Sequence, residues 1–285
     1  MGREFTGLVI SGGGLKMVSV IGVLKKIFET HDRDKLIHFV GTSAGAILCT
    51  CLVLGFTIQD MISFLKEVAK LDEATTFSVD EIFGLIDNYG LNSGAPLDVI
   101  LVRLLKFKGY KDDITFMDVA KMTGKNLVIC VSNVSKQQDE FMCVDTAPTM
   151  PVRKALRMSC SIPILLTPVI HAGDTYVDGC LFNNFPISYF KNHSMKDVIG
   201  INISTQNYAG FHDFMGFMRS MLFALMDKVT SYANREYRES SLNNIMSIEL
   251  KEDQWIQFDT MKVTLSDEKI DGMINEGYRH ESLQN

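Results

Sequence analysis

The feature that most constrains the fold is a strand–turn–helix pattern that occurs twice near the start of the chain. The β-branched run 5–10 ends in the glycine turn 11–14 and continues into apolar residues at helical spacing. The run 37–40 leads through a second small-residue turn into the apolar stretch 44–56. Strands that alternate with helices favour a parallel sheet. We therefore predict an α/β fold with a mainly parallel central sheet.

Capping boxes predict three further helix starts, because a threonine or serine is followed three positions later by an acidic residue. The pairs are Thr57 with Asp60, Ser78 with Glu81, and Thr115 with Asp118. Three more strands are predicted, over residues 126–134, 140–144 and 197–204, and the second is a hairpin return. The middle of the chain is therefore expected to be largely helical.

Composition indicates one ordinary globular domain, with 285 residues, of which 46% are hydrophobic and 22% charged. We find no repeat, low-complexity segment or linker, and we predict a catalytic core over residues 1–210. Residues 211–285 are predicted to form a helical, charged extension packed on the same domain. The formal net charge is −6, so the chain lacks the excess of basic residues that is typical of a nucleic-acid-binding protein.

No targeting segment is evident. Residues 1–6 lead directly into a strand-like run, without the apolar region and cleavage site of a signal peptide. The longest apolar stretch, 44–56, is shorter than the roughly 20 residues of a membrane span. The six cysteines include no C-x-x-C pair or zinc-finger spacing. We predict buried free thiols, no metal site, and an intracellular, cytoplasmic protein with peripheral membrane association.

Residues 211–226 are dense in phenylalanine and methionine. One interpretation is a core helix of the same domain. The other is a mobile lid or interfacial helix that contacts acyl chains.

The first candidate for chemistry is the turn Gly12, Gly13, Gly14, which lies between a predicted strand and a predicted helix. Glycines at this point let backbone N–H groups converge on an anion. The turn does not match the dinucleotide-binding motif, because Met17 stands where the third glycine belongs. It does not match a P-loop either, because Lys16 is not part of such a motif. A purely structural tight turn is the alternative interpretation.

The second candidate is Ser43, which lies in a Gly-Thr-Ser-Ala-Gly run that matches the G-x-S-x-G pattern. A strand is predicted before this run and a helix after it, as a nucleophile elbow requires. A serine nucleophile needs a base, and in α/β-hydrolases a histidine comes last in the sequence. Four histidines follow Ser43 and two precede it, and no setting singles one out: His171, His193, His212, His280, His31 and His38.

The third candidate is Asp178, which follows the short apolar run 175–177 and precedes Gly179 and Cys180. Residues 182–186 then read Phe-Asn-Asn-Phe-Pro. Taken alone, an aspartate before a glycine is typical of a turn.

Together, the glycine loop, the G-x-S-x-G turn, and the Asp-Gly run followed by Asn-Asn-x-Pro resemble the patatin-like phospholipase family. The resemblance extends from about residue 5 to 207. It includes residues 155–168, which are similar to the family's Ala-Ser-x-x-x-Pro neighbourhood. Two positions depart from the family pattern: Met17 replaces a glycine, and Cys180 replaces a glycine or another small residue.

The resemblance implies a three-layer α/β/α fold and a catalytic Ser–Asp dyad without histidine. In that dyad Ser43 attacks an ester carbonyl and Asp178 accepts the serine proton. The backbone of Gly12, Gly13 and Gly14 would hold the oxyanion, and Lys16 is a candidate contact for an anionic head group. No metal or organic cofactor is implied.

Our leading hypothesis is a lipid acyl hydrolase of phospholipase A type that works through an acyl-enzyme on a membrane or lipid aggregate. A carboxylate with an ordinary pKa is a weak base for a hydroxyl, so a raised pKa in an apolar site would help. One alternative is a catalytically inactive patatin-like protein that binds lipid or acts as a scaffold. The other is a Ser–His–Asp esterase or acyltransferase.

Overall fold

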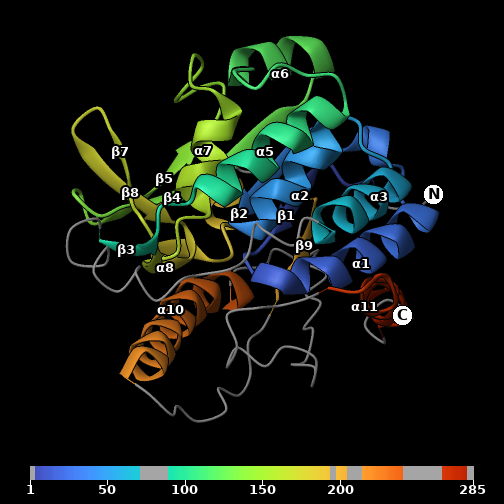
Figure 1. Cartoon of the computed structure of the whole chain (residues 1–285). Helices are drawn as coiled ribbons and strands as arrows, with labels where there is room; N and C mark the ends of the chain where they lie inside the picture. Colours follow the sequence, from blue (N-terminus) through green and yellow to red (C-terminus); the bar gives the residue numbers. More distant parts are fainter. Residues whose placement is uncertain (1–3, 71–88, 193–196, 204–213, 240–264, 281–285) are drawn as a thin grey trace.

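The computed structural model describes residues 4–70, 89–192, 197–203, 214–239 and 265–280 (Figure 1). The strands are β1 (Gly7–Ile10), β2 (His38–Thr42), β3 (Gly90–Asn92), β4 (Asn126–Asn133), β5 (Gln138–Met142), β6 (Ile164–Leu166), β7 (Val169–His171), β8 (Asp174–Asp178) and β9 (Val198–Ile201). The α-helices are α1 (Met17–Thr30), α2 (Ala44–Val53), α3 (Ile58–Ala69), α5 (Ala95–Phe107), α6 (Phe116–Thr123), α7 (Val152–Ser159), α8 (Cys180–Asn183), α9 (Ser188–Asn192), α10 (Phe214–Glu239) and α11 (Asp267–Tyr278). Two short 3-10 helices, η1 (Gly14–Lys16) and η2 (Arg33–Lys35), complete the elements.

A seven-stranded sheet forms the centre of the molecule, and its strands follow the order β7-β8-β4-β2-β1-β9, with β5 also paired to β4. The four consecutive strands β9, β1, β2 and β4 are parallel to one another. Strands β5 and β8 pair with β4 in the antiparallel sense, and β7 extends β8 in the same way. The predicted α/β class is confirmed, and the sheet is parallel in its central part only.

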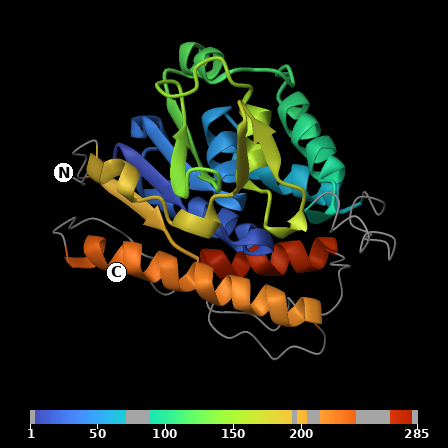
Figure 2. The ribbon, with the colours of Figure 1, turned by 90° about the vertical axis from the view of Figure 1, so that its left-hand side faces the viewer.

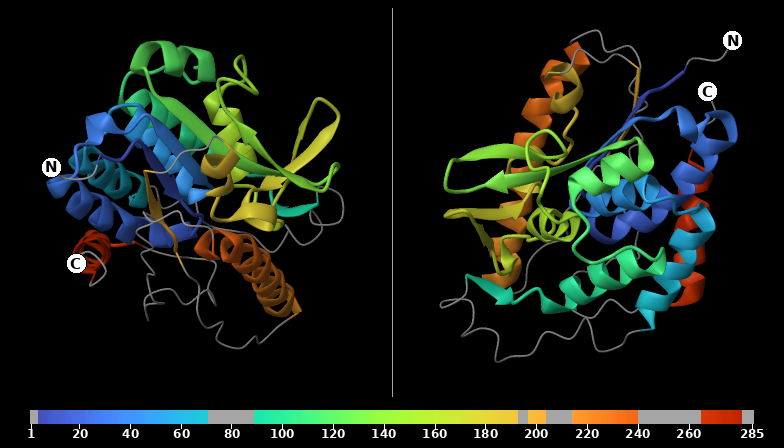
Figure 3. Two further views of the ribbon diagram at one scale, coloured as in Figure 1. Left: turned by 180° about the vertical axis from the view of Figure 1, so that it is seen from behind. Right: turned by 90° about the horizontal axis from the view of Figure 1, so that it is seen from above.

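Both faces of the sheet are covered by apolar side chains. Leu8 and Phe39 belong to the larger core, to which α1, α2, α3, α5, α7 and α11 contribute. Val9, Val40 and Val128 belong to a smaller core on the other face, which α9 and the segment before it complete. Successive side chains of a strand point to opposite faces, so each face of the sheet packs on one of the two cores. The sheet therefore lies between two layers, as Figure 1 and the two views of Figure 3 show.

Local signals predicted the early elements well. The capping boxes at Thr57 and Thr115 are both formed, whereas the predicted box at Ser78 lies outside the described residues. The apolar stretch 44–56 is the buried helix α2, which ends at Val53 because Gly55 adopts a φ of 80°. All six cysteines are buried and free, as predicted.

Two helices from the C-terminal part of the sequence pack on different elements. Helix α10 contacts α8, and α11 lies along α1 (Figure 2). The contact between α1 and α11 depends on glycine, since a Cβ on Gly277 would lie 1.8 Å from the carbonyl oxygen of Ser19. Likewise, a Cβ on Gly22 would lie 1.9 Å from the carbonyl oxygen of Ile274.

Helix α10 covers most of the predicted segment 211–226, of which residues 211–213 lie outside the described part. It has a buried side at Met226 and an exposed apolar side that includes Met221, Leu225 and Val229. Within the described residues, no helix combines the length and apolar character needed to cross a bilayer.

Candidate active site

The pairing of β4 brings two predicted site residues together. Thr42, the last residue of β2, pairs with Cys130, and the next residue of β4, Val131, pairs with Asp178 at the end of β8. Strand β5 occupies the opposite edge of β4 over the same residues, so β8 continues the sheet on the edge used by β2. Ser43 follows Thr42 directly, so the register puts it beside Asp178.

Ser43 stands on a strained turn between β2 and α2. Its φ of 53° and ψ of −126° lie outside the regions that L-residues prefer. The turn requires glycine at Gly45, where a Cβ would lie 2.4 Å from the carbonyl oxygen of Ile10. The N–H of Ser43 donates to the hydroxyl of Ser159 at 2.8 Å, and that hydroxyl donates to the carbonyl of Cys130 at 2.7 Å. This is the geometry expected of a nucleophile elbow.

The side chains of Ser43 and Asp178 are directly hydrogen-bonded. Ser43 Oγ donates to Asp178 Oδ2 at 2.7 Å. Asp178 Oδ1 accepts from the N–H of Cys180 at 2.9 Å and from the thiol of the same residue. The Asp178 N–H donates to the carbonyl of Ser161 at 2.8 Å, which fixes the end of β8 against the loop after α7.

Burial controls the protonation of Asp178, which is fully inaccessible to solvent. Loss of hydration raises the pKa of its carboxyl from 3.8 to about 6, while the hydrogen bonds from Cys180 and Ser43 oppose the rise. The carboxylate is therefore a stronger base than an exposed aspartate, yet it remains largely ionised near neutral pH.

The glycine loop lies beside Ser43. A Cβ on Gly12 would stand 3.2 Å from the Ser43 Cβ and 2.5 Å from Asn184 Oδ1. The N–H of Gly12 donates to the Asn184 carbonyl at 3.1 Å, and Asn184 Nδ2 donates to the Gly12 carbonyl at 3.4 Å. Within the described residues, the N–H groups of Gly13 and Gly14 have no acceptor. These two groups, rather than that of Gly12, are available to an anion.

Lys16 ends the short helix η1 that follows the glycines, and its side chain is buried. Its backbone N–H donates to the Gly13 carbonyl at 3.1 Å, which tightens the loop. Met17, one of the two departures from the family pattern, is the first residue of α1.

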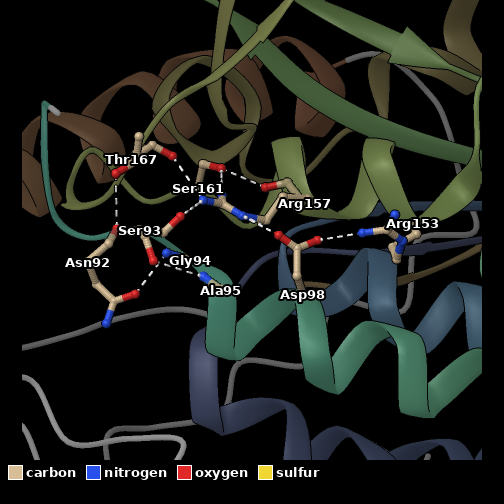
Figure 4. A network of polar contacts seen from close by, with 9 residues as sticks. All are labelled: Asn92, Ser93, Gly94, Ala95, Asp98, Arg153, Arg157, Ser161 and Thr167. Carbon is tan, nitrogen blue, oxygen red and sulfur yellow. Dashed lines mark hydrogen bonds and ion pairs between the residues drawn. The ribbon is translucent and has the colours of Figure 1, made fainter.

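A buried arginine that sequence reasoning did not single out supports the loop after α7 (Figure 4). The Arg157 guanidinium donates to the Ser161 hydroxyl, to the carbonyl of Ser93 at 2.8 Å, and to the carbonyl of Thr167 at 3.1 Å. It also lies 3.6 Å from a carboxylate oxygen of Asp98 on α5. The network joins α5 and α7 to Ser161, whose carbonyl accepts from the N–H of Asp178.

Ser159 and Asn184 are further residues whose contacts the sequence did not reveal. Ser159 lies in the run that carried the family resemblance, and Asn184 in the Asn-Asn-x-Pro run, so motif context was the available signal. Their partners, Ser43 and Gly12, are far away in the sequence, and only the folded sheet brings them together.

Neither Ser43 nor Asp178 hydrogen-bonds to a histidine in the part of the chain that the structure describes. His171 contacts Lys154, and His38 contacts Asn126. His193 and His212 lie outside the described residues. Among those residues there is also no group of three or more histidine, cysteine, aspartate or glutamate side chains that could hold a metal.

Comparison with known proteins shows which sequences and folds this chain is similar to. "Uncharacterized protein R571" of Acanthamoeba polyphaga mimivirus is 30% identical over 205 residues, which are 72% of this chain and 67% of that protein. "Probable lipid hydrolase 463L" of Invertebrate iridescent virus 6 is 30% identical over 199 residues, 68% of this chain and 67% of that protein.

The fold is also similar to that of VipD from Legionella pneumophila, with a TM-score of 0.57 and 20% identity. That match covers 99% of this chain and 67% of VipD. The family model for patatin-like phospholipases matches residues 8–191, a range that contains the glycine loop, the serine turn and the Asp-Gly run. The chain therefore belongs to the patatin-like phospholipase family.

Proposed function

We propose that this protein is a lipid acyl hydrolase of phospholipase A type that uses Ser43 and Asp178 as a catalytic dyad. The observation that carries the proposal is the 2.7 Å hydrogen bond from Ser43 Oγ to Asp178 Oδ2. Family membership and the iridescent virus relative named as a lipid hydrolase support the choice of a lipid ester as substrate.

The proposed reaction begins when Ser43 Oγ attacks the ester carbonyl carbon and its proton passes to Asp178 Oδ2. The N–H groups of Gly13 and Gly14 are the proposed donors to the oxygen that becomes negative, a contribution of a few kcal/mol in comparable sites. The tetrahedral intermediate then collapses, and the leaving alkoxide takes the proton from Asp178. Water, deprotonated by Asp178, then attacks the acyl-enzyme. Collapse of this second tetrahedral intermediate breaks the bond to Ser43 Oγ, which takes the proton back from Asp178 as the fatty acid leaves.

Lys16 is the proposed contact for an anionic head group. Because its side chain is buried at the end of η1, it would act on an anion that reaches into the site rather than on the membrane surface. Its position at the end of η1, directly after the glycine loop, supports this role.

We also propose that α10 contacts the surface of the lipid aggregate. It packs on α8, which begins two residues after Asp178, and its exposed side includes Met221, Leu225 and Val229 at helical spacing. An exposed apolar stripe next to the site that must receive acyl chains favours peripheral binding to lipid.

The decisive experiment measures fatty acid release from phosphatidylcholine vesicles by wild type, Ser43→Ala and Asp178→Asn, with and without chelator. Both variants should lose at least about 100-fold in rate, since each removes a group that acts in the transition state. Ser135→Ala and Asp112→Asn remove an exposed hydroxyl and an exposed carboxylate and serve as matched controls. Wild-type rates in either dyad variant would reject the mechanism.

A fluorophosphonate probe separates the remaining alternatives. Stoichiometric labelling of Ser43 would support an activated serine. A wild-type protein that binds vesicles but neither reacts with the probe nor releases fatty acid would be an inactive lipid-binding member of the family. Loss of activity in a histidine variant, with Asp178→Asn tolerated, would instead indicate a Ser–His–Asp enzyme.

A further inference from the structure

Cys180 differs from the family pattern at a position that touches the proposed base. Within the described residues, Asp178 Oδ1 accepts two hydrogen bonds, and both come from Cys180, one from its backbone N–H at 2.9 Å and one from its thiol. The other carboxylate oxygen, Oδ2, accepts from Ser43. A glycine or alanine at position 180 would keep the backbone donor and lack the thiol donor.

The thiol is a donor and not a nucleophile. Cys180 is buried, and burial together with the neighbouring Asp178 charge raises the pKa of its thiol well above 9. A thiolate at this place would be buried against the Asp178 carboxylate, so the protonated S–H form is strongly favoured.

Among the described residues, the other titratable groups on which the Asp178 charge acts are also thiols. Cys130 on β4 and Cys160 at the end of α7 both have pKa values raised by burial, and the Asp178 charge contributes to each rise. The side chains that counter the effect of burial on Asp178 are therefore Cys180 and Ser43. Of these two, only Cys180 can be changed without removing the proposed nucleophile.

We propose that the Cys180 thiol is a positioning residue that holds the Asp178 carboxylate ionised and turned toward Ser43 by donating to Oδ1. This inference rests on the proposed function, because it assigns a second role at the same dyad. It implies that the enzyme works at lower pH than the same site would with glycine or alanine at position 180.

The test is the pH dependence of kcat/KM for wild type, Cys180→Ala and Cys180→Ser. In the pH profile of kcat/KM, the acid limb of Cys180→Ala should lie roughly 0.5 to 1 pH unit higher than that of wild type. A shift of this size is expected for the loss of one modest hydrogen bond to a charged group. On the alkaline plateau the carboxyl is ionised in all variants, so the rate of Cys180→Ala there should fall only to the extent that Asp178 loses its orientation toward Ser43. Cys180→Ser keeps a donor and should restore the limb to its wild-type position.

Cys143→Ala is the matched control, because it removes another buried thiol, one that contacts Thr146 rather than the dyad. Its acid limb should coincide with that of wild type. Two results would overturn the proposal. One is that the acid limbs of the pH profiles of wild type and Cys180→Ala coincide, and the other is that the acid limb of Cys143→Ala moves as far as that of Cys180→Ala.

A second measurement does not depend on activity. In the full-length Ser43→Ala background, the 13C carboxyl signal of Asp178 can be titrated with and without Cys180→Ala. The titration midpoint should rise in the double variant. If the protein hydrolyses no ester but the midpoint rises, the dyad function fails while the thiol contact stands. If activity depends on the dyad and the midpoint does not move, only the role of Cys180 fails.

Discussion

Asp178 is the residue at which stability and the proposed chemistry oppose each other. The folded protein holds its carboxyl in a site where the charged form is disfavoured, and the chemistry needs that charged form. In the unfolded chain an aspartate titrates near 3.9. The native state therefore binds the Asp178 proton more tightly than the unfolded state does. The stability that this bound proton contributes is fully present below about pH 4 and is lost as the pH rises through about 6.

We predict that Asp178→Asn makes the protein more stable than wild type above pH 7. A pKa rise from 3.8 to about 6 corresponds to about 3 kcal/mol of stability, an upper bound because the amide must still find partners. Thermal or urea denaturation of both proteins between pH 4 and 8 measures the difference. The gap in unfolding free energy should shrink toward zero near pH 4, and an unchanged gap at every pH would contradict the argument.

At the scale of elements, the loop after α7 depends on the Arg157 network (Figure 4). We predict that Arg157→Met lowers the free energy of unfolding by about 3 kcal/mol or more. The variant leaves the Ser161 hydroxyl and two loop carbonyls without their buried donor. Activity should fall as well, because Ser161 bonds the backbone of Asp178.

Arg153→Met is the matched control for that variant. Arg153 pairs with the same Asp98 at 2.9 Å, but both side chains are more than a third exposed. The loss should stay within about 1 kcal/mol, as for other surface ion pairs. Urea denaturation compares the two variants, and equal losses would mean that the buried network adds nothing beyond a surface ion pair.

A further prediction at this scale concerns α10. Leu225→Glu should lower the rate on phosphatidylcholine vesicles about fivefold or more, since a charge in the exposed stripe opposes entry into the acyl region. Hydrolysis of a monomeric soluble ester should not change. Val99→Glu places the same charge at a similarly exposed residue on α5 and should leave both rates unaltered. Equal effects on vesicle and monomer rates would count against a lipid-binding role.

Much of the fold near the start of the chain was predictable because its signals are local. The G-x-S-x-G turn, the capping boxes and the alternation of buried strand residues each depend on a few adjacent positions. Element ends were less predictable. The strand expected over 5–10 begins at Gly7, where the N–H groups of Thr6 and Gly7 both donate to the Asp197 carbonyl. That partner belongs to a distant segment, so no local pattern encodes it.

At the scale of the whole molecule, the site depends on strand pairings that the sequence does not reveal. Nothing in residues 174–178 indicates that they join β4 in the antiparallel sense, on the edge that β2 also uses. The same is true of Ser159 and Arg157, whose contacts are set by tertiary structure. The family resemblance identified Ser43 and Asp178, and the sheet register explains why they meet.

The contact between α1 and α11 yields a prediction with an internal control. Gly277→Ala would put a methyl group 1.8 Å from a backbone carbonyl, so the helices must separate, and stability should fall by about 2 kcal/mol or more. Gly272→Ala, on the exposed side of the same helix, meets nothing within 4 Å and should raise stability by about 0.5–1 kcal/mol. Opposite shifts in melting temperature are expected. Shifts of the same sign would contradict the close packing.

The same contact sets an order of events during synthesis. Helix α1 leads directly from the glycine loop, yet its outer side is covered by residues from the other end of the sequence. While the ribosome is still adding those residues, that side of α1 lacks its native cover and leaves apolar surface exposed. All strands of the central sheet precede α11 in the sequence, so the strands that carry Ser43 and Asp178 can pair before α11 covers α1.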